Sequence, residues 1–367
     1  MKEDRLSNSK SLLRVILILM LLAVLPVATM AQSPDSPSVA QDATPEKPAS
    51  EQLDGQPTES VENPKQDPKT KPKKLEFTKQ VVVYQTIDGA EPEQLKCDIY
   101  TPQGEGPFPA ILAVHGGAWR QGTKFAMLRH AWKMAQSGYV VVSINYRHAP
   151  KHPFPAQIHD CKHAIRWMRS NAEKYKIDPE RIGAFGYSAG GHLVSLLGTS
   201  DKEDGLEGPV EKEFEKFDTR VKAVAAGGAP CEFSWLGKDS KTLSYWLGGS
   251  RDQKPETYRA ASPTTFVSAD DPAFFFFHGD SDLLVPASSP QALHDLLEKA
   301  GVKSEFHTAK KGGHLGTFTD IRWMEQAIVF FDKHLKDQEG DQKKEGSDKP
   351  KDSKPELKPK LKPKPKR

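Results

Sequence analysis

Gly186-Tyr187-Ser188-Ala189-Gly190-Gly191 is the stretch that decides the fold of this 367-residue chain. It follows a short apolar run, residues 181–186, that predicts a strand, and it leads directly into residues 188–197, which predict a helix. A turn this sharp crowds the side chains on both sides of the serine, which explains a glycine two residues before Ser188 and another two residues after it. The turn raises the serine hydroxyl above the sheet at the amino end of a helix. Ser188 is therefore the candidate nucleophile.

Predicted strands and helices alternate on both sides of this turn. Apolar strands are predicted at 110–114, 139–145, 181–186, 221–226, 273–277 and 304–308, and helices at 124–137, 156–172, 188–197, 286–300 and 317–335. An antiparallel pair, 80–87 and 94–100, is predicted before them. Because the later strands are apolar on both faces, we predict an α/β fold with a mostly parallel central sheet and helices on both faces. Residues 231–258 are expected to form a small cap over a pocket, and 200–218 a polar surface insertion.

A second glycine-rich turn, His115-Gly116-Gly117-Ala118-Trp119, follows the strand predicted at 110–114. Two consecutive glycines allow the backbone to approach a substrate carbonyl and to direct N–H groups towards it. Gly117 and Ala118 are therefore candidate donors of an oxyanion hole, together with Ala189 at the first turn of the following helix. The histidine of this turn is expected to form structural hydrogen bonds beneath the loop.

A serine hydroxyl becomes a strong nucleophile only when a histidine takes its proton and a carboxylate orients that histidine. Among the 12 histidines, His314 follows the last predicted strand in a Gly-Gly turn, at the end of the sheet where α/β folds collect active groups. The loop after the preceding strand offers Asp280 and Asp282. We predict Asp282 as the acid and keep Asp280 as the alternative, because Ser188, Asp282 and His314 then follow the order Ser…Asp…His. His278, at the end of the same strand, is expected to serve packing.

The chain ends have a composition that cannot support a packed core. Only 37% of the chain is hydrophobic, which is low for a protein that is globular throughout. Residues 32–74 hold eight prolines, and residues 336–367 hold five prolines and 12 Lys or Arg. Neither segment buries enough apolar surface to offset its ordering entropy. We therefore predict one α/β domain at 75–335, between a disordered proline-rich spacer and a disordered Lys/Pro-rich tail.

Residues 1–31 have the pattern of a signal peptide. Basic side chains precede an apolar run at 15–25, and Thr29-Met30-Ala31 places small residues at the cleavage positions. The run is shorter than the roughly 20 residues needed to span a bilayer. We therefore expect cleavage after Ala31 and a secreted or periplasmic protein, with an uncleaved membrane anchor as the alternative.

Charge and cysteine content limit the ligands that the domain is expected to bind. The formal net charge is +3, but the excess positive charge lies in residues 1–31 and 336–367 and leaves the core slightly acidic, so nucleic acid is not expected as a ligand. The basic tail is suited to electrostatic contact with anionic envelope polymers. No motif indicates a metal, nucleotide or flavin, so no cofactor is expected. The three cysteines lack metal-ligand spacing and are expected to be buried free thiols: Cys97, Cys161 and Cys231.

These motifs together resemble the α/β-hydrolase superfamily over essentially all of residues 75–335. Residues 115–119, 145–150 and 186–191 are similar to the hormone-sensitive-lipase-like esterases. The stretch His278-Gly279-Asp280-Ser281-Asp282, followed by Val285-Pro286, is closer to the secreted bacterial bifunctional feruloyl and acetyl xylan esterases. The acid of that subgroup is the Asp of an HGxxDxxVP stretch, which implies Asp282 here. Two positions depart from the lipase-like pattern: Ala118 replaces a glycine, and Trp119 gives the HGGxW variant that arylformamidases share.

The sequence therefore predicts a serine carboxylic-ester hydrolase. Ser188 attacks the ester carbonyl, His314 acts as base and then as acid, and Asp282 orients it. Trp119 and Tyr187 are expected to shape the substrate pocket. The expected substrates are short-chain acyl esters, small or polysaccharide-linked, and the resemblance implies acetyl or feruloyl esters among them. Three alternatives stay open: an arylformamidase-like amidase, a prolyl-oligopeptidase-like peptidase, and a non-catalytic envelope-binding protein on a hydrolase scaffold.

Overall fold

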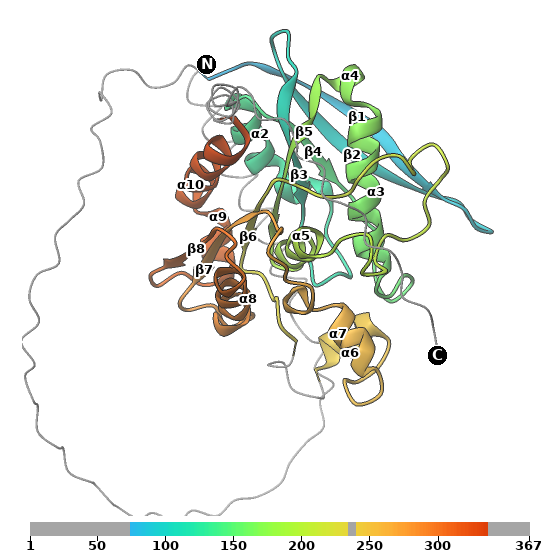
Figure 1. The fold of residues 1–367 in the computed structure, drawn as a ribbon, viewed down its shortest axis with the longest axis vertical. Coiled ribbons are helices and arrows are strands. Elements are labelled where there is room, and N and C mark those ends of the chain that lie inside the picture. The colour runs from blue at the N-terminus through green and yellow to red at the C-terminus, as the bar shows by residue number, and fades with distance from the viewer. Residues whose placement is uncertain (1–73, 234–239, 337–367) are drawn as a thin grey trace, which may run out of the picture. The chain divides into compact units, whose positions relative to one another are not determined.

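The core of the fold is one eight-stranded sheet, which the computed structural model describes within residues 74–233 and 240–336 (Figure 1). The strands are β1 (Phe77–Ile87), β2 (Glu93–Pro102), β3 (Phe108–Val114), β4 (Val140–Ile144), β5 (Ile177–Tyr187), β6 (Ala223–Gly227), β7 (Ala273–Gly279) and β8 (Ser304–Ala309). Their order across the sheet is β1-β2-β4-β3-β5-β6-β7-β8. β2 runs antiparallel to both β1 and β4, and all the other neighbours are parallel. The mostly parallel sheet and its antiparallel start confirm the predicted fold class.

Helices cover both faces of this sheet (Figure 1). They are η1 (Lys124–Met127), α2 (Leu128–Gln136), α3 (Ala156–Ser170), α4 (Ala172–Tyr175), α5 (Ala189–Thr199), α6 (Lys241–Leu247), α7 (Pro255–Ala260), η2 (Pro263–Thr265), α8 (Ser288–Lys299), α9 (His314–Thr319), α10 (Ile321–Phe331) and η3 (Asp332–Lys336). The buried side chains of α3, α5 and α8 belong to one hydrophobic cluster, and those of α2 and α10 to another. The two clusters lie on opposite faces, so the sheet is the middle layer of three.

Four consecutive phenylalanines in β7 show why such a strand reads as continuously apolar. Phe274 and Phe276 belong to the cluster that holds α3, α5 and α8, whereas Phe275 and Phe277 belong to the cluster that holds α2 and α10. All four are at most 3% exposed. Because successive side chains point to opposite faces of a sheet, a strand buried on both faces needs an apolar residue at every position.

Two predicted boundaries are wrong. One lies near the carboxyl end of the domain, and the other is the start of β5. The helix predicted at 317–335 is broken at Asp320, whose side chain accepts the N–H of Arg322 and caps a new helix, α10. The preceding residues form α9, which begins at His314. β5 begins at Ile177 instead of residue 181, and an irregular register against β3 accommodates the additional residues.

Several predictions concern residues outside the described part of the chain. The signal peptide, the spacer and the Lys/Pro-rich tail fall on residues 1–73 and 337–367, and the expected cap includes residues 234–239. Within the described part, no helix is both long enough and apolar enough to span a membrane. All three cysteines are described, and they are buried and unpaired, as the sequence predicts.

Candidate active site

Ser188 lies on a strained turn between β5 and α5. Its backbone has φ 57° and ψ −125°, a conformation that residues other than glycine rarely adopt. A Cβ atom added to Gly186 would lie 2.2 Å from the carbonyl oxygen of Gly190, and one added to Gly190 would lie 2.1 Å from the carbonyl oxygen of Val114. Both glycines are thus required by close backbone approaches, as the sequence indicates. The turn leaves Ser188 partly exposed at the amino end of α5.

The glycine-rich loop after β3 lies beside this serine. A Cβ atom added to Gly116 would lie 3.1 Å from the Cβ of Ser188. The next three residues, Gly117, Ala118 and Trp119, have φ values of 127°, 51° and 59°. Ala118 and Trp119 thus hold a left-handed backbone conformation that residues other than glycine seldom adopt.

The candidate oxyanion donors have free N–H groups. Within residues 74–233 and 240–336, those of Gly117, Ala118 and Ala189 donate to no protein acceptor. N–H groups without a protein partner are available to a ligand, as the donors of an oxyanion hole must be. Their assignment to an oxyanion hole stays a prediction.

Asp282 and His314 meet in a short hydrogen bond. Nδ1 of His314 lies 2.6 Å from Oδ2 of Asp282, and the Asp282 side chain is fully buried. The other carboxylate oxygen accepts the backbone N–H groups of Leu284 at 2.9 Å and Val285 at 3.0 Å. Burial favours protonation of Asp282, but the hydrogen bonds from His314 and Val285 outweigh it and lower the pKa of the carboxyl group. Because an ionised carboxylate only accepts, Nδ1 of His314 carries a hydrogen, and in the neutral form of this ring the lone pair lies on Nε2.

Asp280, the alternative acid, lies elsewhere. It is exposed, and its Oδ1 accepts the hydroxyl of Ser281 at 2.9 Å. The carboxylate that contacts His314 therefore belongs to Asp282.

His278 approaches the acid more closely than its expected packing role implies. Its Nε2 lies 2.9 Å from the carbonyl oxygen of Val285 and 3.6 Å from Oδ2 of Asp282. Burial lowers the pKa of His278, so the ring is neutral and donates its hydrogen to Val285. This bond closes the loop that carries Asp282. His278 lies four residues before Asp282 in the same sequence motif, and this spacing could have predicted the contact.

Tyr187 and Trp119, the expected pocket residues, are both buried. Tyr187 is 3% exposed, and its hydroxyl donates to the backbone carbonyl of His314 at 2.6 Å. Trp119 is 4% exposed, stacks on Trp246 of α6 with ring centroids 3.8 Å apart, and donates its indole N–H to Nδ1 of His192 at 3.1 Å. These contacts leave both side chains little surface for a substrate, and their pocket role stays a prediction.

His115 makes structural hydrogen bonds to the glycine-rich loop, as the sequence predicts. Its Nδ1 lies 2.7 Å from the carbonyl oxygen of Gly116, and its ring stacks on that of Tyr146 at 4.3 Å. The Tyr146 hydroxyl donates to the carbonyl oxygen of His115 at 3.0 Å. Burial lowers the pKa of His115 to about 3, so it is neutral and acts through hydrogen bonds.

Exposed leucines flank Asp282 and His314. Leu283 is 95% exposed and Leu284 59% exposed directly after Asp282, and Leu315 is 39% exposed directly after His314. Large apolar side chains that stay exposed beside a site commonly contact a ligand. The turn that carries Leu283 and Leu284 is held at its backbone, because Asp282 accepts the N–H groups of Leu284 and Val285. Together with Leu315 of α9, these leucines form an apolar rim.

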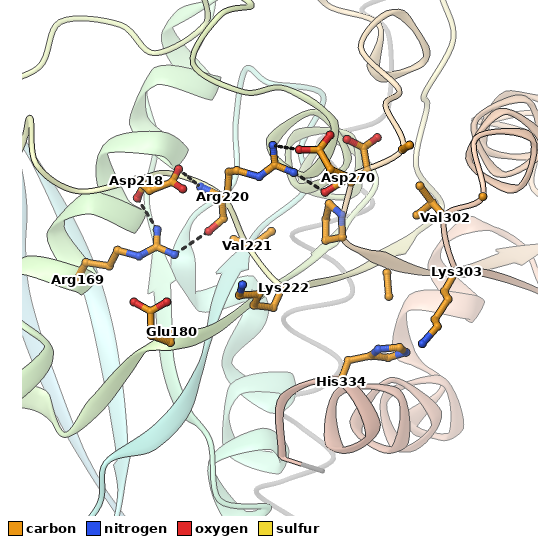
Figure 2. A pocket seen from close by; sticks show the side chains of 15 residues that line it. Arg169, Glu180, Asp218, Arg220, Val221, Lys222, Asp270, Val302, Lys303 and His334 are labelled. Carbon is orange, nitrogen blue, oxygen red and sulfur yellow. Dashed lines mark hydrogen bonds and ion pairs between the residues drawn. The ribbon is translucent and has the colours of Figure 1, made fainter. Parts of the chain in front are cut away.

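A cavity of about 490 Å³ lies at the opposite end of the parallel strands, where β6, β7 and β8 begin (Figure 2). Its lining carries charges of both signs. The Arg220 side chain pairs with Asp270 at 2.9 Å, and Arg169 donates to the backbone carbonyls of Asp218 and Arg220 (Figure 2). Because this cavity lies at the opposite end of the strands, it is separate from the site around Ser188.

The fold and this site define an α/β-hydrolase. No three His, Cys, Asp or Glu side chains within the described residues come together as metal ligands. The family model named BD-FAE matches residues 97–297, more than half of the chain, and the chain belongs to that family.

Known relatives agree with this assignment. The sequence is 33% identical over 204 residues to the probable carboxylic ester hydrolase LipM of Mycobacterium tuberculosis, a match covering 53% of this chain and 46% of that protein. The chain spans about half the length of the curated relatives that it matches. Among solved structures, a truncated carbohydrate esterase from gut microbiota has a TM-score of 0.65 and 29% identity, covering 72% of this chain and 98% of the other. Thermogutta terrifontis esterase 2, phosphoramylated by tabun, has a TM-score of 0.60 and 26% identity, covering 70% and 94%.

Proposed function

We propose that this protein is a secreted serine carboxylesterase that hydrolyses short-chain acyl esters through Ser188, His314 and Asp282. The observation that carries the proposal is the 2.6 Å bond between His314 and a buried, ionised Asp282, on a sheet whose β5 ends in the strained Ser188 turn. The carboxylesterases among its sequence and structural relatives support the same reaction class.

The first half-reaction acylates the serine. Nε2 of His314 takes the hydroxyl proton as the Ser188 oxygen bonds to the ester carbonyl carbon, and the carbonyl oxygen becomes an oxyanion. The N–H groups of Gly117, Ala118 and Ala189 stabilise this oxyanion, each by about 3 kcal/mol. The C–O bond to the alcohol then breaks, and His314 returns its proton to the departing alkoxide.

The second half-reaction releases the acid. His314 takes a proton from water, the water oxygen bonds to the acyl carbon, and the bond to Ser188 breaks as the serine oxygen regains the proton. Asp282 keeps its negative charge throughout, and it stabilises the imidazolium that forms twice per turnover. The lowered pKa of Asp282 keeps the carboxylate ionised at neutral pH.

For the substrate class we propose acetyl and feruloyl esters of polysaccharides. Family membership supports this choice, as does the similarity to a gut-microbiota carbohydrate esterase. The apolar rim of Leu283, Leu284 and Leu315 offers a contact surface for the phenyl ring of a feruloyl group. Secretion is proposed on the signal-peptide pattern of residues 1–31, and contact of the basic tail with anionic polymers on its charge.

The proposal is tested with the wild-type protein and Ser188→Ala. Substrates are a p-nitrophenyl ester series from acetate to octanoate, methyl ferulate, acetylated xylan and an aryl formamide. We expect ester hydrolysis that falls on the order of a millionfold in kcat on loss of Ser188. Diethyl p-nitrophenyl phosphate should add to Ser188 alone, as peptide mass spectrometry will show.

Each outcome distinguishes between the alternatives. Hydrolysis of the formamide with silence on every ester would replace the esterase by an amidase. Silence on all substrates, with no covalent phosphoryl adduct on a folded protein, would favour the non-catalytic binding protein. Ester hydrolysis that survives Ser188→Ala would refute the mechanism.

A further inference from the structure

We propose that Tyr187 is a positioning residue that fixes the catalytic base, His314, relative to the nucleophile. The inference rests on the proposed function of this site and assigns Tyr187 a role other than substrate contact. It starts from a geometric problem that the sheet order creates.

The nucleophile and the base are carried by strands that do not touch. Ser188 follows β5 and His314 follows β8, and β6 and β7 lie between these strands (Figure 1). The turn that carries His314 is tied to the ends of β7 and β8, because Gly312 donates its N–H to the carbonyl oxygen of Ala309 and accepts the N–H of Ser281. A contact across the ends of β6 and β7 would relate the position of His314 to that of the serine turn.

The Tyr187 side chain crosses this space. A Cβ atom added to Gly227 would lie 2.5 Å from Cδ2 of Tyr187, and one added to Gly228 would lie 2.8 Å from its Cζ. The ring therefore lies directly over the end of β6, where only glycine leaves room for it. Its centroid is 5.8 Å from that of Phe277 in β7 and 4.9 Å from that of Phe318 in α9.

The hydroxyl of this ring is hydrogen-bonded to the backbone of His314. It donates to the backbone carbonyl of His314 at 2.6 Å, and the two ring centroids are 5.2 Å apart. Tyr187 is 3% exposed, so water does not compete for the bond. Burial raises the pKa of the Tyr187 hydroxyl, which keeps it protonated as a donor.

Tyr187 is also tied to the nucleophile by covalent connection. It is the residue directly before Ser188, whose own N–H donates to the carbonyl oxygen of Gly227 at 2.8 Å. One rigid, buried phenol thus joins the serine turn to the histidine turn, 127 positions further along the chain. Small displacements of a catalytic group lower the rate by large factors. Loss of this contact should therefore lower kcat more than it changes KM.

The test compares Tyr187→Phe with a matched control, Tyr139→Phe. The Tyr139 hydroxyl also donates over 2.6 Å, to Asp332 at the start of η3, away from Ser188 and His314. Two measurements are made on each full-length protein. One is kcat and KM on p-nitrophenyl acetate, per Ser188 titrated with diethyl p-nitrophenyl phosphate. The other is the proton NMR signal of the His314 Nδ1 hydrogen, recorded without substrate and assigned with Asp282→Asn.

We expect Tyr187→Phe to lower kcat about ten- to a hundredfold with KM nearly unchanged, and Tyr139→Phe to leave both nearly unchanged. The Nδ1 signal should move or broaden in Tyr187→Phe alone, because the freed turn loosens the bond to Asp282. An unmoved Nδ1 signal would overturn the inference, as would equal losses of kcat in the two variants. If the wild type hydrolyses no ester, the esterase proposal fails by itself and the NMR comparison still decides on Tyr187.

Discussion

Replacing Asp282 by asparagine tests the acid of the site without disturbing its loop. The carboxylate uses Oδ1 for the N–H groups of Leu284 and Val285, and Oδ2 for Nδ1 of His314. In Asp282→Asn the two backbone donors select the amide oxygen for the Oδ1 position. The amide NH₂ must then face His314, and Nδ1 becomes an acceptor. The hydrogen of the neutral ring moves to Nε2, and the base can no longer take the serine proton.

The expected loss follows from the geometry. The charge of Asp282 stabilises the His314 imidazolium, and an ion pair near 4 Å is worth about 4 kcal/mol at an effective dielectric constant of 20. At about 1.4 kcal/mol per tenfold, this charge corresponds to roughly a thousandfold in rate. The wrong tautomer adds to it, so we expect kcat to fall by about 10³ to 10⁴, as it does for this substitution in other triads.

The assay is steady-state hydrolysis of p-nitrophenyl acetate at pH 7–9. KM should change little, because the imidazolium forms only after substrate has bound. Asp280→Asn is the matched control: it removes a neighbouring, exposed carboxylate that bonds to Ser281 and not to His314, and its kcat should stay at the wild-type value. Activity of Asp282→Asn within about tenfold of the wild type would refute the assigned role. A loss confined to Asp280→Asn would transfer that role to the neighbour.

Two further predictions concern the oxyanion loop and the buried histidines. Gly117→Ala should lower kcat about a hundredfold, because the added Cβ would lie 2.0 Å from the carbonyl oxygen of Gln121 and the loop must move. The control is Gly301→Ala. Gly301 also has a positive φ, but the space around its Cβ is open, so this variant should keep full activity in the same assay. Burial lowers the pKa of His130 to about 4 in the folded protein. As the pH falls below about 6.5, His130 therefore becomes protonated in the unfolded chain first. The free energy of unfolding then decreases by about 1 kcal/mol per pH unit, down to the pKa of the folded state. Urea unfolding between pH 7 and pH 5 should therefore show a shallower pH dependence for His130→Gln than for the wild type, and equal slopes would contradict the argument.

The motifs predicted from the sequence are those whose chemistry is local. The glycines around Ser188 are required by backbone atoms four residues away or in the adjacent strand, and strand–turn–helix patterning indicates such crowding directly. Asp282 precedes the N–H groups that it accepts by two and three residues, so the turn that holds it is also written in one short stretch. The break at Asp320 was missed because apolar periodicity continues through it, although an Asp before an apolar run is a known helix start.

What the sequence could not show is the support of these motifs by distant residues. Tyr187 meets His314 from 127 positions away, Tyr146 meets His115 from 31, and Trp119 meets His192 from 73. No local pattern specifies such pairs, because a buried tyrosine or tryptophan satisfies its polar atom with whatever acceptor the fold brings within reach. The expectation that Tyr187 and Trp119 line the pocket followed from their position beside the motifs, and it did not include the direction of their side chains.

The arrangement of these supports bears on how the site achieves its geometry. The nucleophile, the base and the acid each sit on a turn with a glycine at or next to it, and such turns are conformationally permissive. Buried polar side chains restrain the turns of the base and the acid and the glycine-rich loop beside the serine: Tyr187 holds the base, His278 the loop of the acid, and His115 the glycine-rich loop. Burial keeps both histidines neutral, so the restraints carry no charge near the reacting atoms. Among the described residues, Asp282 is then the one buried carboxylate that contacts His314, and in the proposed mechanism the imidazolium finds its counter-charge there and not in a supporting residue.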